Sequence, residues 1–317
     1  MRILVLRGGA VGDFLVTLPM LGLLRARWPD AAIELIGNAR AAELGLRNGD
    51  LNAVHSQDEG RWSALFGGGP LPAPLADWLA AFDLIVSFWP DPDATLARRF
   101  PVRAGQQVLT GSATPTLAPA ARHFCEALRP LGLATTDFRS RLATGGWTLP
   151  GTSVADLARA PSASAFGDPR RAVAVHPGSG SARKNWPIPC WRKLLARIGQ
   201  PVLLILGEAE SEWLNLGADL GVTDESAALL VSRPPIEISR NLPLPELAVT
   251  LARCRRFIGH DSGLSHLAAA VGTPCVLLFG PTEPAMWAPP GDHVRVIRRG
   301  DRLEMITVEE VLAAVNG

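Results

Sequence analysis

The stretch that decides the fold is HDSGLSHLAAAVGTPCVLLFGPTEP, residues 260–284. Its pattern predicts a strand, a polar turn, a short apolar helix and a continuous apolar strand, over 256–259, 260–263, 264–271 and 275–279. Gly272 suits the left-handed position after a helix, and Pro274 prevents the helix from continuing. Because a fully apolar strand after a helix is typical of a buried parallel sheet, the stretch predicts an α/β fold.

The polar turn contains the candidate binding residues Asp261, Ser262 and Gly263. It is expected at the carboxyl end of a strand and the amino end of a helix. Open α/β sheets bind ligands at this edge, and the unpaired N–H groups and dipole of the helix favour anions there. Asp261 and Ser262 are equally suited to cap the helix and do nothing else. The rest of the chain has to decide between these two interpretations.

Length and composition exclude several classes of protein. A chain of 317 residues is long enough for two domains. With 31 basic and 30 acidic residues, its balance disfavours a nucleic-acid-binding surface. The four scattered cysteines have no metal-ligand spacing, so we expect reduced thiols and no metal site. The apolar segments do not match a signal peptide or a membrane span, so we expect a cytoplasmic protein.

The loop PGSGSARKNWP, residues 177–187, follows a strand expected at 172–176. Glycines let backbone amides approach a ligand, serines add hydroxyl donors and Lys184 adds a compact positive charge, a set that suits a phosphate. Only two of the 31 basic residues are lysines, which draws attention to Lys184. A flexible surface loop is the alternative, but Trp186 disfavours it because an aromatic side chain there should pack.

The chain opens with another strand–turn–helix unit, a strand over 3–6 and a helix from Asp13 to about residue 27. Further strands are expected over 33–36 and 83–88. Its glycines match neither G-x-G-x-x-G nor G-x-x-x-x-G-K-[ST], which disfavours a Rossmann dehydrogenase or a P-loop enzyme. Asp13 is either a helix N-cap or a carboxylate at the edge of the sheet that accepts a proton. The helix dipole favours its ionised form, as a general base requires.

A third strand end, after the strand expected at 201–206, contains Glu208 and Glu210. A carboxylate here could bind the hydroxyl pair of a ribose, or it could simply complement the first turn of a helix. Three loops, 177–187, 207–210 and 260–264, are therefore expected to meet at one edge of a sheet. Their combination is more specific than any one of them.

The division into domains is predicted from composition. Residues 144–169 include GGWTLPGTS and APSASAFGDP, which suit an interdomain connection. We therefore expect an N-terminal domain over 1–165, with the connection starting at about 144, and a C-terminal domain over 166–317. The last helix, expected over 307–315, belongs to the second domain or packs back on the first.

Together these residues resemble glycosyltransferase family 9, the heptosyltransferases that build the inner core of lipopolysaccharide. The resemblance is carried by LRGGAVGDFLVTLPMLGLLRARWPDAAIELIG, HPGSGSARKNWPIPCW, LGEAESE and LPLPELAVTLARCRRFIGHDSGLSHLAAAVGTPCVLLFGPTEP. It implies the GT-B architecture, an α/β fold of two Rossmann-like domains whose parallel sheets face a central cleft. The N-terminal domain would bind the acceptor and the C-terminal domain the nucleotide-sugar donor.

The resemblance also implies roles for individual residues. Asp13, preceded by Gly12, would be the general base that deprotonates the acceptor hydroxyl. The other implied residues bind the donor: Ser179 or Ser181 with Lys184 at the diphosphate, Glu210 (with Glu208 as the alternative) at the ribose, Asp261 at the sugar, the amides of Ser262 and Gly263 at the diphosphate, and His266 in support.

The implied reaction is an inverting, metal-independent transfer of a sugar to a lipopolysaccharide-core or related glycan acceptor. The expected donor is ADP-heptose, bound as a substrate, with no cofactor. We expect a monomer, and leave open a peripheral contact with the cytoplasmic face of the inner membrane. Two alternatives remain, a nucleotide-sugar-binding protein without catalysis and another GT-B enzyme such as a nucleotide-sugar epimerase.

Overall fold

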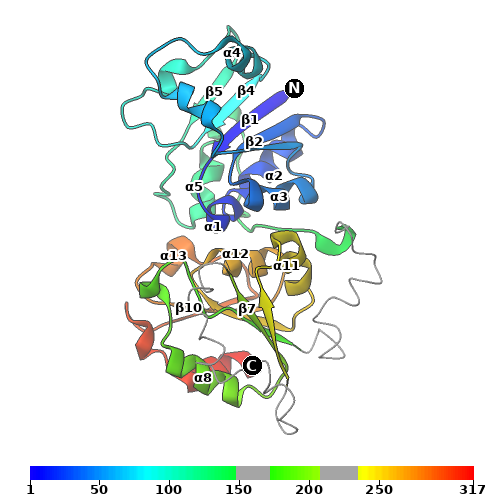
Figure 1. Cartoon of the computed structure of the whole chain (residues 1–317), viewed down its shortest axis with the longest axis vertical. Helices are drawn as coiled ribbons and strands as arrows, with labels where there is room; N and C mark the ends of the chain where they lie inside the picture. Colours follow the sequence, from blue (N-terminus) through cyan, green and yellow to red (C-terminus); the bar gives the residue numbers. More distant parts are fainter. Residues whose placement is uncertain (148–171, 208–234) are drawn as a thin grey trace. The chain divides into compact units, whose positions relative to one another are not determined.

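A computed structural model describes residues 1–147, 172–207 and 235–317. The chain divides into two compact units, unit 1 over Met1–Ser140 and unit 2 over Arg141–Gly317. The boundary predicted at residue 165 lies outside the described residues, as does most of the predicted connection. Each unit is an α/β structure built on its own parallel sheet (Figure 1).

Unit 1 contains a sheet of five parallel strands in the order β3-β2-β1-β4-β5. The strands are β1 (Arg2–Arg7), β2 (Ala32–Gly37), β3 (Ala53–Ser56), β4 (Leu84–Ser87) and β5 (Gln107–Thr110). The strand order reverses between β1 and β4. Open α/β sheets bind ligands at such a switch point, outside the carboxyl ends of the strands. The turn after β1 is therefore at the edge where a ligand is expected.

The helices of unit 1 cover both faces of this sheet. They are α1 (Val11–Leu15), α2 (Leu18–Arg27), α3 (Ala39–Asn48), α4 (Ala73–Ala80) and α5 (Ala120–Glu126). Alternate side chains of a strand point to opposite faces. Leu4 and Leu6 of β1 accordingly pack in one core cluster with Leu75 and Leu79 of α4, while α1 packs against α3 and α2 packs against α5.

The helix predicted from Asp13 to residue 27 is two helices, because the chain starts the second one afresh at Leu18. Pro19 explains the interruption. Proline has no N–H, and its ring clashes with the carbonyl four residues earlier, so it is tolerated only in the first turn of a helix. The short helix α1 and its amino end are thereby separated from the longer α2.

Unit 2 contains six parallel strands in the order β11-β10-β9-β6-β7-β8. They are β6 (Val173–Val175), β7 (Val202–Leu206), β8 (Ile236–Arg240), β9 (Arg256–His260), β10 (Cys275–Phe279) and β11 (Val294–Arg298). Counted within the unit, this is the strand order 3-2-1-4-5-6 of dinucleotide-binding folds. The reversal lies between β6 and β9, which pair directly.

The helices of unit 2 form two layers on this sheet (Figure 1). They are α8 (Ile188–Arg197), α11 (Leu244–Leu251), α12 (Gly263–Ala270), α13 (Pro284–Trp287) and α14 (Val308–Asn316). The last helix, α14, packs against α8 and β10 of its own unit, whereas α12 packs against β9, β10 and α11. In the part of the chain that the structure describes, no helix is long and apolar enough to cross a membrane.

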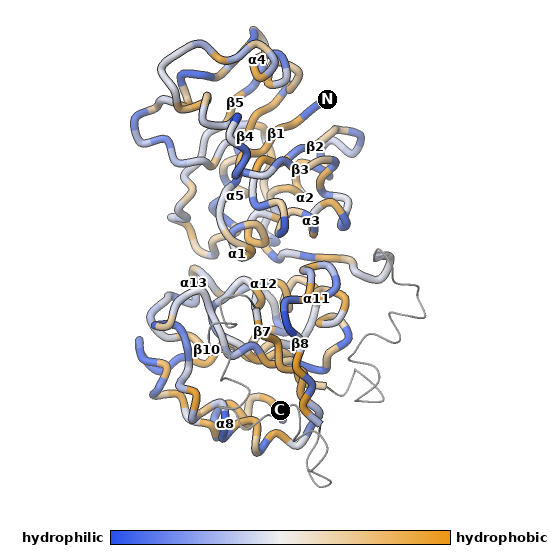
Figure 2. Tube along the Cα trace, in the orientation of Figure 1, coloured by the Kyte–Doolittle hydropathy of each residue, from blue (hydrophilic) through white to orange (hydrophobic). Residues whose placement is uncertain are grey.

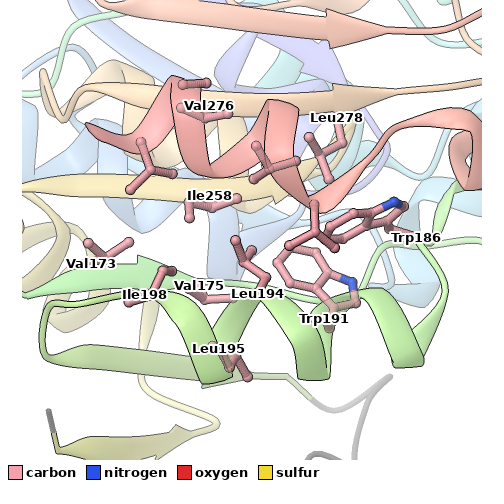
Figure 3. Packing of buried hydrophobic residues seen from close by; sticks show 14 of the residues in the cluster. Val173, Val175, Trp186, Trp191, Leu194, Leu195, Ile198, Ile258, Val276 and Leu278 are labelled. Carbon is pink, nitrogen blue, oxygen red and sulfur yellow. The ribbon is translucent and has the colours of Figure 1, made fainter. Parts of the chain in front are cut away.

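A buried cluster lies between the sheet of unit 2 and the pair α8 and α14 (Figure 3). The strands β7 and β10, which contribute to it, are apolar throughout (Figure 2). Trp186 and Trp191 are each 1% exposed, with their rings edge to face at 5.2 Å. Burying a side chain of this size contributes roughly 1.5–3 kcal/mol or more to stability. The prediction that Trp186 packs is confirmed, and the loop that precedes it therefore ends in the core.

Candidate active site

The loops after β6 and β9 lie side by side at the switch point of unit 2, because the two strands are paired neighbours. The first loop contains Ser179, Ser181 and Lys184, and the second contains Asp261 and Ser262. The two loops are about 80 residues apart in sequence. The sheet brings together the predicted phosphate donors and the predicted helix amino end.

An ion pair connects the two loops. The Nζ atom of Lys184 lies 3.1 Å from Oδ2 of Asp261. The side chains are 26% and 11% exposed, so the pair is only partly hydrated. Lys184 ends a short 3₁₀ turn, Ala182–Lys184, and Asp261 is the last residue before the N-cap of α12. The pair therefore holds a positive charge close to the amino end of that helix.

Ser262 is the N-cap of α12, and its hydroxyl accepts a hydrogen bond from the backbone N–H of Ser265 at 3.4 Å. Gly263 is the first residue of the helix. The first N–H groups of a helix have no partner inside it, and together with the helix dipole they favour an anion. His266 is buried on the same helix, one turn further on, and its N–H donates to the carbonyl of Ser262.

The two candidate serines differ in their surroundings. The hydroxyl of Ser179 lies 2.8 Å from the carbonyl of Ser181 and 2.6 Å from Oδ1 of Asn185, and it accepts from the N–H of Ser181. The hydroxyl of Ser179 is therefore occupied by contacts within the loop. Within the described residues the hydroxyl of Ser181 has no such partner, so Ser181 is the better placed of the two to bind a ligand.

The predicted ribose residues, Glu208 and Glu210, lie outside the described residues. The strand before them, β7, does pair with β6. Its carboxyl end is therefore beside the loop that contains Lys184. The ribose assignment stays a prediction.

In unit 1, Asp13 lies at the switch point, on the short helix α1 after β1. It was predicted at the entrance of the helix, but the helix begins at Val11 with Ala10 as its N-cap, so Asp13 is the third helical residue. Its Oδ2 accepts a hydrogen bond from the N–H of Ala10 at 2.8 Å. This is half of a capping box, since alanine has no side-chain oxygen to complete it. Gly12 precedes Asp13, and its carbonyl accepts from Val16.

Arg7, the last residue of β1, holds the other oxygen of this carboxylate. Its Nη2 donates to Oδ1 of Asp13 at 2.8 Å, and its guanidinium lies 4.5 Å from the centre of the Phe124 ring. Burial lowers the pKa of Arg7, and the charge of Asp13 opposes that effect. The Arg7 side chain is 4% exposed and that of Asp13 37% exposed. A carboxylate has about four acceptor sites, so Asp13 is oriented and can still accept a proton from a ligand.

Gly9 is required for this arrangement. Its φ is +112°, and a Cβ atom there would lie 2.5 Å from Oδ2 of Asp13. The peptide is held from both sides, because Asn38 donates to the Gly9 carbonyl and Gln57 accepts from its N–H, each at 3.2 Å. Sequence reasoning missed Arg7, Asn38 and Gln57. Of the three, Arg7 could have been found from the sequence, because it is a charged residue at the end of an otherwise apolar strand.

Cysteines and metal ligands form no second candidate site in the described parts of the chain. Cys125, Cys254 and Cys275 are buried, and burial raises the pKa of each thiol to about 12. Over residues 1–147, 172–207 and 235–317, no three His, Cys, Asp or Glu side chains are grouped closely enough to hold a metal ion.

Two Rossmann-like units in one chain, each with candidate site residues at the switch point of its sheet, match the GT-B fold. Solved structures agree with this fold. A family 9 glycosyltransferase from Veillonella parvula DSM 2008 aligns with a TM-score of 0.76 at 19% identity, over 99% of this chain and 96% of that one. The E. coli heptosyltransferase WaaC with ADP-2-deoxy-2-fluoro heptose aligns with a TM-score of 0.70 at 20% identity, over 100% and 99%.

Sequence comparison identifies the family. The model of glycosyltransferase family 9 (heptosyltransferase) matches residues 146–313, more than half of the chain. Lipopolysaccharide heptosyltransferase 3 of Escherichia coli (strain K12) is 25% identical over 323 residues, which cover 95% of this chain and 88% of that protein. The chain belongs to glycosyltransferase family 9.

Proposed function

We propose that this glycosyltransferase moves a heptose from ADP-heptose to a lipopolysaccharide-core or related glycan acceptor, with inversion at the anomeric carbon. The observation that carries the proposal is the pairing of Lys184 with Asp261 beside the amino end of α12. The names of its relatives support the choice of sugar, since one is a lipopolysaccharide heptosyltransferase and another was solved with an ADP-heptose analogue.

The donor half of the reaction needs groups that stabilise a departing diphosphate. As the bond to the sugar breaks, negative charge collects on the diphosphate oxygens. Lys184, the hydroxyl of Ser181 and the amides of Ser262 and Gly263 would donate to those oxygens. Removing one preorganised donor of this kind typically costs about 2.7–4 kcal/mol of transition-state stabilisation.

Asp261 has two roles in this proposal. It holds Lys184 in place through the 3.1 Å pair. When the diphosphate binds, Lys184 turns to the phosphate oxygens and the carboxylate becomes free to accept hydrogen bonds from the sugar hydroxyls. The opposite charges of the two residues would therefore balance each other before binding. After binding, Lys184 would contact the diphosphate and Asp261 the sugar.

The acceptor half of the reaction uses Asp13 as general base. Its carboxylate would take the proton of the acceptor hydroxyl, while the oxygen attacks the anomeric carbon on the face opposite the diphosphate. The C–O bond to the diphosphate breaks and the new glycosidic bond inverts the configuration. Arg7 and the N–H of Ala10 keep the carboxylate oriented. Because Lys184 and the amino end of α12 supply the positive potential at the leaving group, we propose a reaction that needs no metal.

The alternatives make different demands on the same residues. A protein that only binds nucleotide sugars has no use for a carboxylate held by Arg7 and Ala10 at the ligand edge of unit 1. A nucleotide-sugar epimerase would convert the donor in the absence of an acceptor. Product analysis with and without a lipopolysaccharide-core acceptor therefore separates transfer from epimerisation.

The experiment begins with a thermal-shift screen of ADP-, GDP-, UDP- and dTDP-sugars, in which we expect ADP-heptose to stabilise the protein most. The Asp13→Asn variant should then transfer the sugar about 10²- to 10⁴-fold more slowly than wild type, because this is the usual contribution of a general base. Its affinity for the donor should stay within a few-fold of wild type. Asp77→Asn, at an exposed position of α4, is the matched control and should transfer normally. Full turnover by Asp13→Asn would refute the assigned base.

A further inference from the structure

His260 is the last residue of β9 and is fully buried. Both nitrogens of its ring contact the neighbouring loop rather than the sheet. The Nε2 atom lies 2.8 Å from the backbone nitrogen of Trp186, and the Nδ1 atom lies 3.3 Å from the carbonyl oxygen of Gly178. The residue next to His260 is Asp261, which pairs with Lys184 of the same loop.

These contacts determine the protonation of the ring. A backbone N–H only donates and a carbonyl only accepts, so Nε2 is the acceptor and Nδ1 carries the proton. The ring also packs edge to face against Trp191, with centres 5.3 Å apart. Burial lowers the pKa of His260 to about 3, with the nearby His176 and Lys184 acting in the same direction. The ring is therefore neutral at physiological pH and keeps one tautomer.

The two hydrogen bonds hold both ends of one segment. Gly178 and Trp186 flank residues 179–185, and this segment contains Lys184 and Ser181. Inside the segment, Lys184 pairs with Asp261, and Ser179 contacts Ser181 and Asn185. A loop that is ordered before a ligand arrives does not lose that conformational freedom on binding.

Filling the core does not by itself require a histidine here. The ring of Trp191 packs against that of His260, and a phenylalanine would fill a similar volume. What phenylalanine cannot provide is an acceptor for the buried N–H of Trp186 together with a donor for Gly178. The two ring nitrogens of His260 therefore satisfy backbone groups of the loop.

We propose that His260 is a positioning residue for the donor diphosphate, which holds the ends of the segment 179–185 so that Lys184 and the loop donors are in place before binding. This inference rests on the proposed function, because it assumes that the loop binds the phosphates of a nucleoside diphosphate.

The test compares His260→Phe with His260→Gln by calorimetric titration of ADP and AMP. Phenylalanine removes both hydrogen bonds, whereas the amide of glutamine can restore the acceptor for Trp186. We expect His260→Phe to weaken ADP binding about tenfold, equivalent to about 1.4 kcal/mol, and AMP binding less. We expect His260→Gln to recover most of the loss. Unchanged ADP affinity in His260→Phe, or an equal loss for ADP and AMP, would overturn the proposal.

His293→Phe is the matched control. His293 lies just before β11, and its Nε2 donates to the carbonyl of Ala269 at the carboxyl end of α12, away from the ligand edge. It should leave ADP affinity unchanged. If wild-type protein bound none of ADP, GDP, UDP and dTDP, the proposed function would fail and this inference with it, an outcome distinct from normal binding by His260→Phe.

A measurement on the wild type covers the case in which His260→Phe does not fold. Nitrogen-15 NMR of labelled histidine should show the proton of His260 on Nδ1, and the amide of Trp186 should exchange as slowly as those of β9. A proton on Nε2, or rapid exchange of the Trp186 amide, would show that the loop is not held by the ring and would overturn the proposal.

Discussion

Replacing Lys184 by methionine isolates the positive charge of the candidate donor site, because methionine keeps the unbranched stem and removes the ammonium group. In the wild type the Nζ atom is 3.1 Å from Oδ2 of Asp261. At this distance Coulomb's law gives about 5 kcal/mol at an effective dielectric constant of about 20 and about 1.3 kcal/mol in bulk water, before any loss of hydration. Since Lys184 is 26% exposed, we expect the pair to contribute only about 1 kcal/mol to the free energy of unfolding.

The effect on binding should be larger than the effect on stability. Hydrogen bonds to charged groups contribute roughly 1.5–3 kcal/mol, so Lys184→Met should raise the Kd of ADP roughly 10- to 150-fold. The carboxylate of Asp261, left without its partner, would add repulsion toward the diphosphate. Asp261→Asn removes that repulsion together with the ion pair that holds Lys184, so it should bind ADP within a few-fold of wild type. Its transfer rate should fall, because an amide oxygen accepts hydrogen bonds from the sugar more weakly than a carboxylate does.

The assay is calorimetric titration of ADP, with transfer measured by product formation. Lys193→Met is the matched control, since Lys193 is the other lysine and lies exposed on α8. The double variant Lys184→Met/Asp261→Asn should bind ADP more tightly than Lys184→Met alone. The reasoning is refuted if Lys184→Met binds ADP like wild type, or if Lys193→Met loses as much affinity.

Three further outcomes are expected. Gly9→Ala should lower the transfer rate by more than tenfold, because its Cβ would displace the carboxylate of Asp13. Gly132→Ala is the control, because its backbone also has a positive φ (+73°) but open space surrounds it, and it should retain activity. Trp186→Ala should lower the free energy of unfolding by about 3–5 kcal/mol in urea denaturation, and a loss below 1 kcal/mol would contradict the packing described. As pH falls from 6.5 toward 3, the histidine at position 260 binds a proton in the unfolded chain but not when it is buried in the folded protein. The free energy of unfolding should therefore fall by up to about 1.4 kcal/mol per pH unit. His260→Gln should show a shallower acid-unfolding profile than wild type.

The strands that could be predicted from the sequence are the inner ones. The apolar runs at 3–6, 33–36, 83–88, 172–176, 201–206, 256–259 and 275–279 correspond to β1, β2, β4, β6, β7, β9 and β10. The four strands that sequence reasoning missed, β3, β5, β8 and β11, are the outer strands of the two sheets. Outer strands are half exposed, so their sequences lack the continuous apolar run that marks an inner strand. These four strands could not be predicted because their sequences do not contain the apolar run that burial on both faces requires.

The candidate site shows the same limit. Lys184 and Asp261 could be selected from residue type and from their expected positions at strand ends, and the structure brings them into contact. The partners that orient them could not be selected. Gln57 and Asn38 reach Gly9 from other strand ends, and His260 reads in sequence as one polar residue in a turn. Such contacts depend on register and side-chain direction, which periodicity does not record.

The indole N–H of Trp186 donates to the carbonyl of Ile306 at 3.1 Å, and the same cluster includes Val308 and Val311 of α14. The loop that contains Lys184 is thus anchored by a segment synthesised more than a hundred residues later. During translation, a ribosome-bound chain that ends before Ile306 would display the loop 177–187 without this anchor. If the loop binds a nucleotide as proposed, that affinity would arise late, only after Ile306 and α14 had emerged and docked.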